Sequence, residues 1–191
     1  MLFRRYMLTI CALFLGISAV AAPVSSQETR LELDPARTTV KFTLADVLHT
    51  VRGDFKLKHG SLFFDPMTGK MGGDLVVDAT SGNSGSEGRD RRMHKNILES
   101  ERYPEIVFSP DRVEGSVAFQ GNSQVRVHGI FKIHGVGHEM TVPVQVQMNN
   151  GQATVSAHFV VPYVQWGMKN PSTLFLRVSD KVDIDVVSTT R

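Results

Sequence analysis

Residues 124–148, QVRVHGIFKIHGVGHEMTVPVQVQM, decide the fold, because apolar and polar side chains alternate along almost their whole length. Alternation with a period of two is typical of a β-strand with one buried and one exposed face. The Gly-Val-Gly run at 135–137 predicts a turn, and His128 and His134 fall on the outward face. We therefore expect two long antiparallel strands that share an apolar inner face: Val125, Val127, Phe131, Ile133, Met140, Val142, Val144, Val146 and Met148.

The same alternation recurs on both sides of this hairpin. Asp65–Gly69 and Asn149–Gly151 have the composition of tight turns between strands. Long amphipathic strands joined by tight turns predict an all-β chain folded as an extended antiparallel β-barrel, with a two-sheet sandwich as the alternative. An outer-membrane pore is excluded, because there the apolar face points outward and the lumen is polar. The inner positions outside the hairpin are Val40, Phe42, Leu44, Phe55, Leu57, Leu62, Phe64, Leu75, Val77, Ala79, Ile106, Phe108, Val117, Phe119, Val155, Ala157, Phe159, Val161, Val182, Ile184 and Val186.

One segment does not have the strand pattern: residues 81–108, SGNSGSEGRDRRMHKNILESERYPEIVF. Its apolar spacing predicts one short helix near residues 87–102, with Met93, Ile97 and Leu98 on a narrow apolar face. We expect this helix to end near Tyr103, because the proline that follows disfavours a helical residue before it. A single helix in a β chain could plug one end of a barrel, or line and gate a cavity.

The first 22 residues have the layout of a secretory signal peptide, since two arginines precede an apolar run that ends in small residues. Cleavage after Ala21 fits the A-x-A pattern, and the general secretory route fits better than twin-arginine export. The only cysteine, Cys11, lies in this run, so the domain at 23–191 must be stabilised by its core and not by disulfides. We expect a periplasmic or secreted protein with no transmembrane segment after signal removal.

Charge gives little indication of a macromolecular partner. The chain has 21 basic and 19 acidic residues, and the surplus lies at Arg4 and Arg5, within the predicted signal. A balanced mature domain argues against binding to nucleic acid or to an anionic membrane surface.

Several segments, in order, resemble the YceI-like family. They are LDPARTTVKFTL, GDFKLKHGSLFFDP, the RDRRMHKNILESERYPEIVF segment, KIHGVGHEMTVPVQV and the final DKVDIDVV. The resemblance covers nearly all of residues 23–191. It implies a lipocalin-like barrel that holds a long apolar chain of the polyisoprenoid or isoprenoid-quinone type. The chain departs from the family pattern at Phe131–Gly135 and at His138 and Glu139, where the family often has lysine and proline after the turn.

A barrel of this kind can fill with its own side chains or enclose a ligand. On the lipid-binding interpretation, the interior residues Phe42, Phe55, Phe64, Phe108, Phe119, Phe131, Val144 and Phe159 contact the lipid. On the alternative interpretation they form a packed core, and the barrel has a structural or interaction role. The helix would supply a lid or headgroup contacts through Arg91, Met93, His94, Ile97 and Leu98, with His94 placed for a structural or headgroup hydrogen bond.

The sequence does not favour catalysis. There is no G-x-S-x-G motif, and the metal-binding motif H-E-x-x-H is absent as well. His134 and His138 flank a turn without a matching carboxylate pair, so solvated histidines are expected and no metal or other cofactor is predicted. We expect lipid binding, with transport or storage, without chemical turnover. An enzyme acting on a lipid in the same cavity remains the alternative, and a homodimer is possible.

Overall fold

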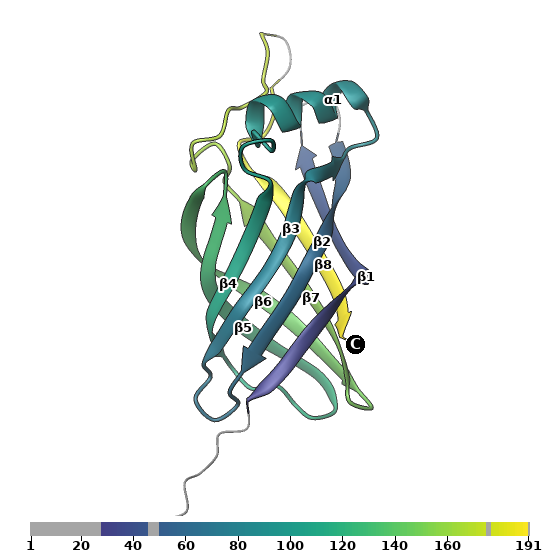
Figure 1. Ribbon diagram of the computed structural model, residues 1–191, viewed down its shortest axis with the longest axis vertical. Helices are drawn as coiled ribbons and strands as arrows, with labels where there is room; N and C mark the ends of the chain where they lie inside the picture. The colour runs from purple at the N-terminus through teal and green to yellow at the C-terminus, as the bar shows by residue number, and fades with distance from the viewer. Residues whose placement is uncertain (1–27, 46–49, 175–176, 191) are drawn as a thin grey trace, which may run out of the picture.

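The computed structural model describes residues 28–45, 50–174 and 177–190, so the predicted signal peptide lies outside the described residues. Eight antiparallel strands form a closed barrel, each paired with its neighbours in chain order and the last with the first (Figure 1). This confirms the predicted all-β, lipocalin-like barrel. The strands are β1 (Thr29–Ala45), β2 (Thr50–Phe64), β3 (Met71–Asn83), β4 (Glu105–Glu114), β5 (Gly121–Ile133), β6 (Val136–Asn149), β7 (Gln152–Val161) and β8 (Val182–Thr190).

The hairpin of β5 and β6 is paired without interruption from Gly121 opposite Met148 to Ile133 opposite Val136. The turn therefore consists of His134 and Gly135, which have φ of 52° and 78°. The predicted turn at 135–137 was one residue late, and His134 is a turn residue and not part of an outward strand face. Two consecutive positive φ values belong to the type I′ turn, whose twist matches that of the flanking strands.

The barrel closes where β1 pairs with both β2 and β8. Phe42, for example, lies opposite Gly53 on one side and Ile184 on the other. Before this point the register of β1 shifts between Leu33 and Thr38, next to Pro35, which has no backbone N–H for a ladder. The hydroxyl of Thr38 donates to the carbonyl of Asp34 at 2.7 Å and stabilises this bulge.

The predicted helix forms at one end of the barrel, as α1 (Glu87–Arg92) continued by the π-helical turn η1 (Met93–Ile97) (Figure 1). It ends at Ile97, not near Tyr103 as predicted. The left-handed backbone of Glu99, with φ of 46°, breaks the helix before the proline can affect it. The amide of Ser100 then donates to the carbonyl of His94 at 3.0 Å and caps the helix end.

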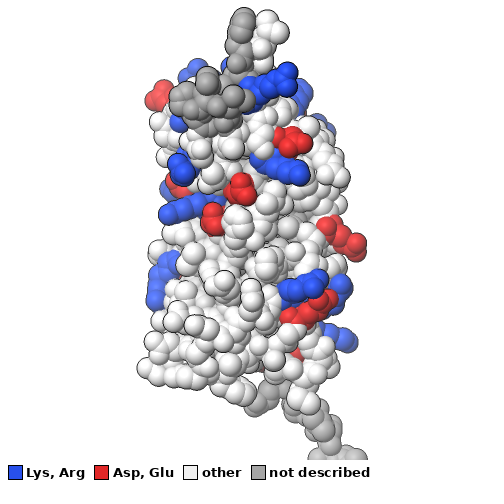
Figure 2. All heavy atoms as spheres, turned by 180° about the vertical axis from the view of Figure 1, so that it is seen from behind, with Lys and Arg blue, Asp and Glu red and all other residues white. Residues whose placement is uncertain are grey.

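Charged side chains lie on the outside of the barrel (Figure 2). One ion pair, Lys58 with Glu105 at 2.7 Å, joins the exposed faces of β2 and β4 across β3. Within the described part of the chain, no helix is long and apolar enough to cross a bilayer.

Candidate functional site

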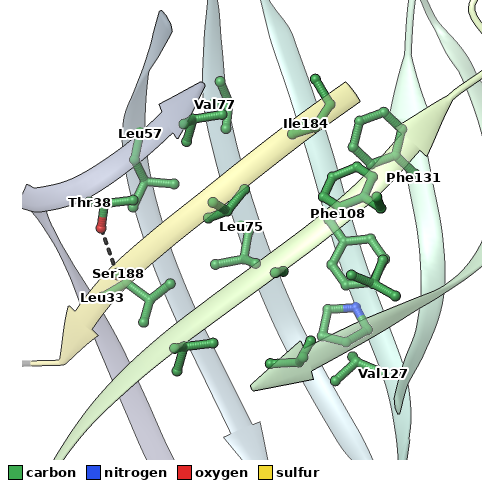
Figure 3. Close-up of a pocket in the computed structure, with 18 of the residues that line it drawn as sticks. Leu33, Thr38, Leu57, Leu75, Val77, Phe108, Val127, Phe131, Ile184 and Ser188 are labelled. Carbon is green, nitrogen blue, oxygen red and sulfur yellow. Dashed lines mark hydrogen bonds between the residues drawn. The ribbon is translucent and has the colours of Figure 1, made fainter. Parts of the chain in front are cut away.

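The barrel is hollow. A cavity of about 420 Å³ extends along its interior, lined by inward side chains from all eight strands and from the helix. Pockets of roughly 300–1,000 Å³ commonly hold small molecules in proteins. Figure 3 shows leucine, valine, isoleucine and phenylalanine side chains converging on this space from several strands. The interior is therefore a cavity of the size that holds small molecules and not a core packed solid with side chains.

The lining is apolar almost throughout. No lining residue carries a charge, and only four have polar groups: Thr29, Thr38, Tyr163 and Ser188. The hydroxyls of Thr38 and Ser188 lie 2.6 Å apart (Figure 3). Because Thr38 donates to the carbonyl of Asp34, Ser188 must donate to Thr38, and the pair offers no free donor to a ligand.

The helix closes one end of the cavity. Met93, Ile97 and Leu98 line it there, joined by Tyr163 and Met168 from the segment that follows β7. All five side chains are buried or half-buried. They belong to one apolar cluster with Phe131 and Ile133, so this end is sealed by packed side chains.

The opposite end is open. The lining there includes Thr29, Pro66, Ala118 and Phe119, all of which are exposed. They come from the start of β1, the turn between β2 and β3, and the connection between β4 and β5, at the end away from α1 (Figure 1). Among the residues that the structure describes, the cavity is thus a blind apolar channel with one mouth. Such a shape suits an elongated, water-insoluble molecule.

A family model for the YceI-like domain matches residues 31–189 of this sequence. The chain belongs to the YceI-like family. None of the curated proteins compared with it matches.

Solved structures share the fold of this YceI-like chain. BcnA from Burkholderia cenocepacia is 19% identical, with a TM-score of 0.71 over 83% of this chain and 99% of its own. A polyisoprenoid binding domain from Saccharophagus degradans, implicated in plant cell wall breakdown, is 18% identical, with a TM-score of 0.64 over 84% and 97%. The YCEI protein of Campylobacter jejuni is 13% identical, with a TM-score of 0.52 over 99% of both chains. At these identities the similarity establishes the barrel fold.

The structure brings most of the predicted interior residues together. Seven line the cavity and are buried or half-buried: Phe42, Phe55, Phe64, Phe108, Phe131, Val144 and Phe159. Phe119 is the exception, because it is 97% exposed at the mouth. Its prediction as an inward strand residue was wrong, since β4 ends at Glu114 and the next residue, Gly115, has φ of 103°.

Of the predicted helix residues, Met93, Ile97 and Leu98 face the cavity, whereas His94 and Arg91 do not line it. His94 makes the structural hydrogen bonds that were one of its two expected roles. Its Nε2 lies 2.9 Å from the carbonyl oxygen of Gly82 and its Nδ1 lies 3.0 Å from the hydroxyl of Ser100. A carbonyl only accepts, so Nε2 carries a proton and donates to Gly82, while Nδ1 and the hydroxyl of Ser100 share the second hydrogen bond. Arg91 is exposed, and a headgroup contact through it stays a prediction.

Sequence reasoning missed an aromatic cluster above the closed end. His138 was expected to be a solvated histidine beside a turn, yet it lies opposite Phe131 in the β5–β6 ladder and so faces the same way. Its ring stacks on Trp166, with centroids 4.1 Å apart and planes 5° apart. Its Nε2 is buried and has no hydrogen-bond partner, and burial lowers the pKa of His138 below its usual value. The two-residue spacing from Met140 was the signal that could have placed it.

The neighbouring histidine, His134, contacts different residues, Tyr103 and Glu99. His134 lies against the ring of Tyr103, with centroids 4.7 Å apart, and its Nε2 is 3.6 Å from a carboxylate oxygen of Glu99. In the part of the chain that the structure describes, no three His, Cys, Asp or Glu side chains are grouped as metal ligands would be.

Proposed function

We propose that this YceI-like barrel binds a long-chain isoprenoid-type lipid, a polyisoprenoid or an isoprenoid quinone, and carries or stores it without chemical turnover. The observation that supports the proposal is the blind channel of about 420 Å³ with no charged residue in its lining. The neighbour named as a polyisoprenoid binding domain supports the isoprenoid class. The predicted signal peptide supports a periplasmic or secreted location for this activity.

Apolar burial is sufficient to hold such a ligand. Each buried methylene contributes about 0.8 kcal/mol, so a chain of some thirty carbons gains on the order of 20 kcal/mol before the costs of ordering and association. Apolar burial discriminates poorly between lipids of different chain length, since one methylene changes the binding free energy by only about 1–3 kcal/mol. The barrel therefore selects a class of lipid more strongly than one species.

The lining also favours binding over turnover. The polar lining side chains are Thr29, Thr38, Tyr163 and Ser188. The hydroxyls of Thr38, Tyr163 and Ser188 are each engaged with another protein group. General acid–base catalysis needs a titratable group within reach of the reacting atoms, and Tyr163 donates its proton to the carbonyl of Ser179 at 2.7 Å.

The direct test is native mass spectrometry of the purified protein, followed by organic extraction and identification of the lipid. We expect one lipid molecule per barrel, of isoprenoid type. A barrel that is always empty, and that takes up neither quinone nor polyprenol when offered them, would overturn the proposal.

A matched pair of variants locates the bound lipid. Ala157 lines the cavity between Val144 and Val186, whereas its neighbour Ser156 faces outward between Gln145 and Val187. Ala157→Phe should lower lipid occupancy by about tenfold or more, because the ring fills space that the chain needs. Ser156→Phe adds the same ring outside the barrel and should leave occupancy unchanged. Equal occupancy in both variants would place the lipid elsewhere.

A further inference from the structure

We infer that the mouth of the barrel docks on an electrically neutral lipid bilayer, and that the lipid passes between bilayer and cavity there. We call this surface the open tip and define it as residues 65–69, between β2 and β3, and residues 115–120, between β4 and β5. The inference rests on the proposed lipid-binding function for the identity of what passes through the mouth. The contact itself can be tested separately.

Two large apolar side chains project from the open tip. Phe119 is 97% exposed and Met67 is 79% exposed. Exposed apolar residues scattered singly are ordinary, but two at the rim of one cavity mark a contact surface. Leu174, which is 89% exposed, belongs to the connection between β7 and β8, at the same end of the barrel as α1 (Figure 1), and is the control.

The open tip holds these side chains outward on a fixed backbone. The carboxylate of Asp65 accepts the amide of Met67 at 2.9 Å and the hydroxyl of Thr68 at 2.7 Å. These hydrogen bonds lower the pKa of Asp65 and direct its charge into the turn. The amide of Val113, in β4, donates to the carbonyl of Gly69 at 2.8 Å and fixes the 65–69 turn against the end of that strand. Met67 therefore needs no rearrangement to meet a surface.

The charged residues in and directly beside the open tip are balanced, two acidic and two basic: Asp65, Glu114, Lys70 and Arg112. Residues 115–125 and 143–157, which contain the two adjacent hairpin connections, include no Asp, Glu, Lys, Arg or His. From behind, the lowest part of the described surface is uncharged and the coloured side chains lie higher on the barrel (Figure 2). A surface that attracts anionic lipids carries clustered Lys and Arg, so this one matches a zwitterionic bilayer.

The apolar surface is continuous from the open tip into the cavity. Pro66, Ala118 and Phe119 are exposed and also line the cavity, with Val117 next to them. A lipid chain that leaves a bilayer at this point meets apolar side chains at every step and is never transferred through water. The closed end, by contrast, has no exposed side chain in the cavity lining.

A bilayer fits the open tip better than a protein partner does. Stable protein interfaces bury roughly 1,200–2,000 Å² in total, which calls for a broad complementary face. The open tip has no broad face: its two projecting side chains, Phe119 and Met67, surround the mouth of the cavity. Insertion of a few apolar side chains gives weak and reversible membrane contact, which transfer of a ligand requires.

The test uses phosphatidylcholine vesicles that contain a polyprenol. Full-length mature protein is mixed with them, and both vesicle flotation and the rate of polyprenol uptake are measured. The double variant Phe119→Asp/Met67→Asp should lose flotation and take up polyprenol at least about tenfold more slowly, because charged side chains do not insert. Its melting temperature should match wild type, because both side chains are exposed and pack against nothing in the core. Leu174→Asp, the matched control, should behave as wild type, and Phe119→Leu should retain uptake.

Three results would overturn the inference. The double variant could keep flotation and uptake, or Leu174→Asp could lose both instead. The third is that wild type binds no vesicles and the double variant loses self-association. The last result would identify the open tip as an interface with a second copy of the chain. A barrel that purifies empty and stays empty, but floats with vesicles through Phe119, would overturn the proposed function and support the contact at the open tip.

Discussion

The imidazole of His138 lies flat on the indole of Trp166, with ring centroids 4.1 Å apart. The stack lies at the closed end of the channel. There the ring of Trp166 also contacts Phe131, with centroids 5.8 Å apart. The segment after β7 thus packs onto the barrel through a titratable side chain. Burial lowers the pKa of His138, so the stack is built around a neutral imidazole.

This stack predicts a loss of stability in mild acid. The pKa of His138 lies below its ordinary value of 6.5 in the folded state, so just below pH 6.5 the unfolded chain binds more protons than the folded one. Stability attributable to His138 is therefore complete above pH 6.5 and falls as the pH drops below it. Urea denaturation between pH 7.5 and pH 5 should show this fall, and His138→Phe, which keeps a ring on Trp166, should reduce it.

Trp166 provides a second readout, because it is the only tryptophan in the chain. Protonation of the stacked imidazole should quench its fluorescence, with a midpoint below pH 6.5 in the folded protein. His138→Phe should abolish this titration. A midpoint at or above 6.5 would contradict the assigned burial of His138.

His94 holds the helix against β3, and we predict that its removal destabilises the fold. His94→Ala leaves the carbonyl of Gly82 and the hydroxyl of Ser100 without their partner, and Ser100 is only 3% exposed. Each buried group left unpaired costs about 1–3 kcal/mol, so the free energy of unfolding should fall by about 2–4 kcal/mol. Lys95→Ala, on the exposed side of the same turn, should change it by less than about 0.5 kcal/mol. Similar effects for the two variants would show that the His94 contacts do not anchor the helix.

Met93 tests whether the helix acts as a lid. Met93→Asp places a carboxylate in the apolar contact that closes the cavity, so lipid should dissociate about tenfold faster or more and the melting temperature should fall. Asn96→Asp adds the same charge at an exposed position of the same helix and is the matched control. If lipid retention and melting temperature stayed unchanged in Met93→Asp, the helix would be neither lid nor plug.

The barrel was predictable because one buried face fixes strand register. A slip of one residue in β5 would turn Val125, Val127 and Phe131 toward solvent, so the alternation in the sequence leaves a single register. Phe119 shows the limit of this reasoning. It continues the alternation after Val117, but the backbone of Gly115 has already ended β4, and local periodicity does not report where a strand stops.

The cavity and its closed end were harder to foresee. Inward residues such as Phe42 and Val144 have the same pattern whether they pack together or enclose space, because volume depends on how eight strands close. The contact of Trp166 with His138 joins a loop to a strand by tertiary packing, and no short-range pattern encodes it. The helix face was predictable from spacing, but the structural role of His94 depended on where Gly82 and Ser100 came to lie.

Tyr163 makes the segment after β7 sensitive to alkali. Its hydroxyl donates to the carbonyl of Ser179 at 2.7 Å, its side chain is 5% exposed, and burial raises its pKa to about 12. Between the ordinary value of 10.0 and about 12 the folded state binds more protons than the unfolded one, so stability falls as the pH rises through this window, by about 3 kcal/mol in all. Tyr163→Phe should cost about 1 kcal/mol at neutral pH through the lost hydrogen bond and should remove this alkaline loss. Denaturant titrations of both proteins from pH 8 to pH 12, with phenolate absorbance followed in parallel, test this prediction. An equal alkaline loss of stability in Tyr163→Phe would show that another group causes it.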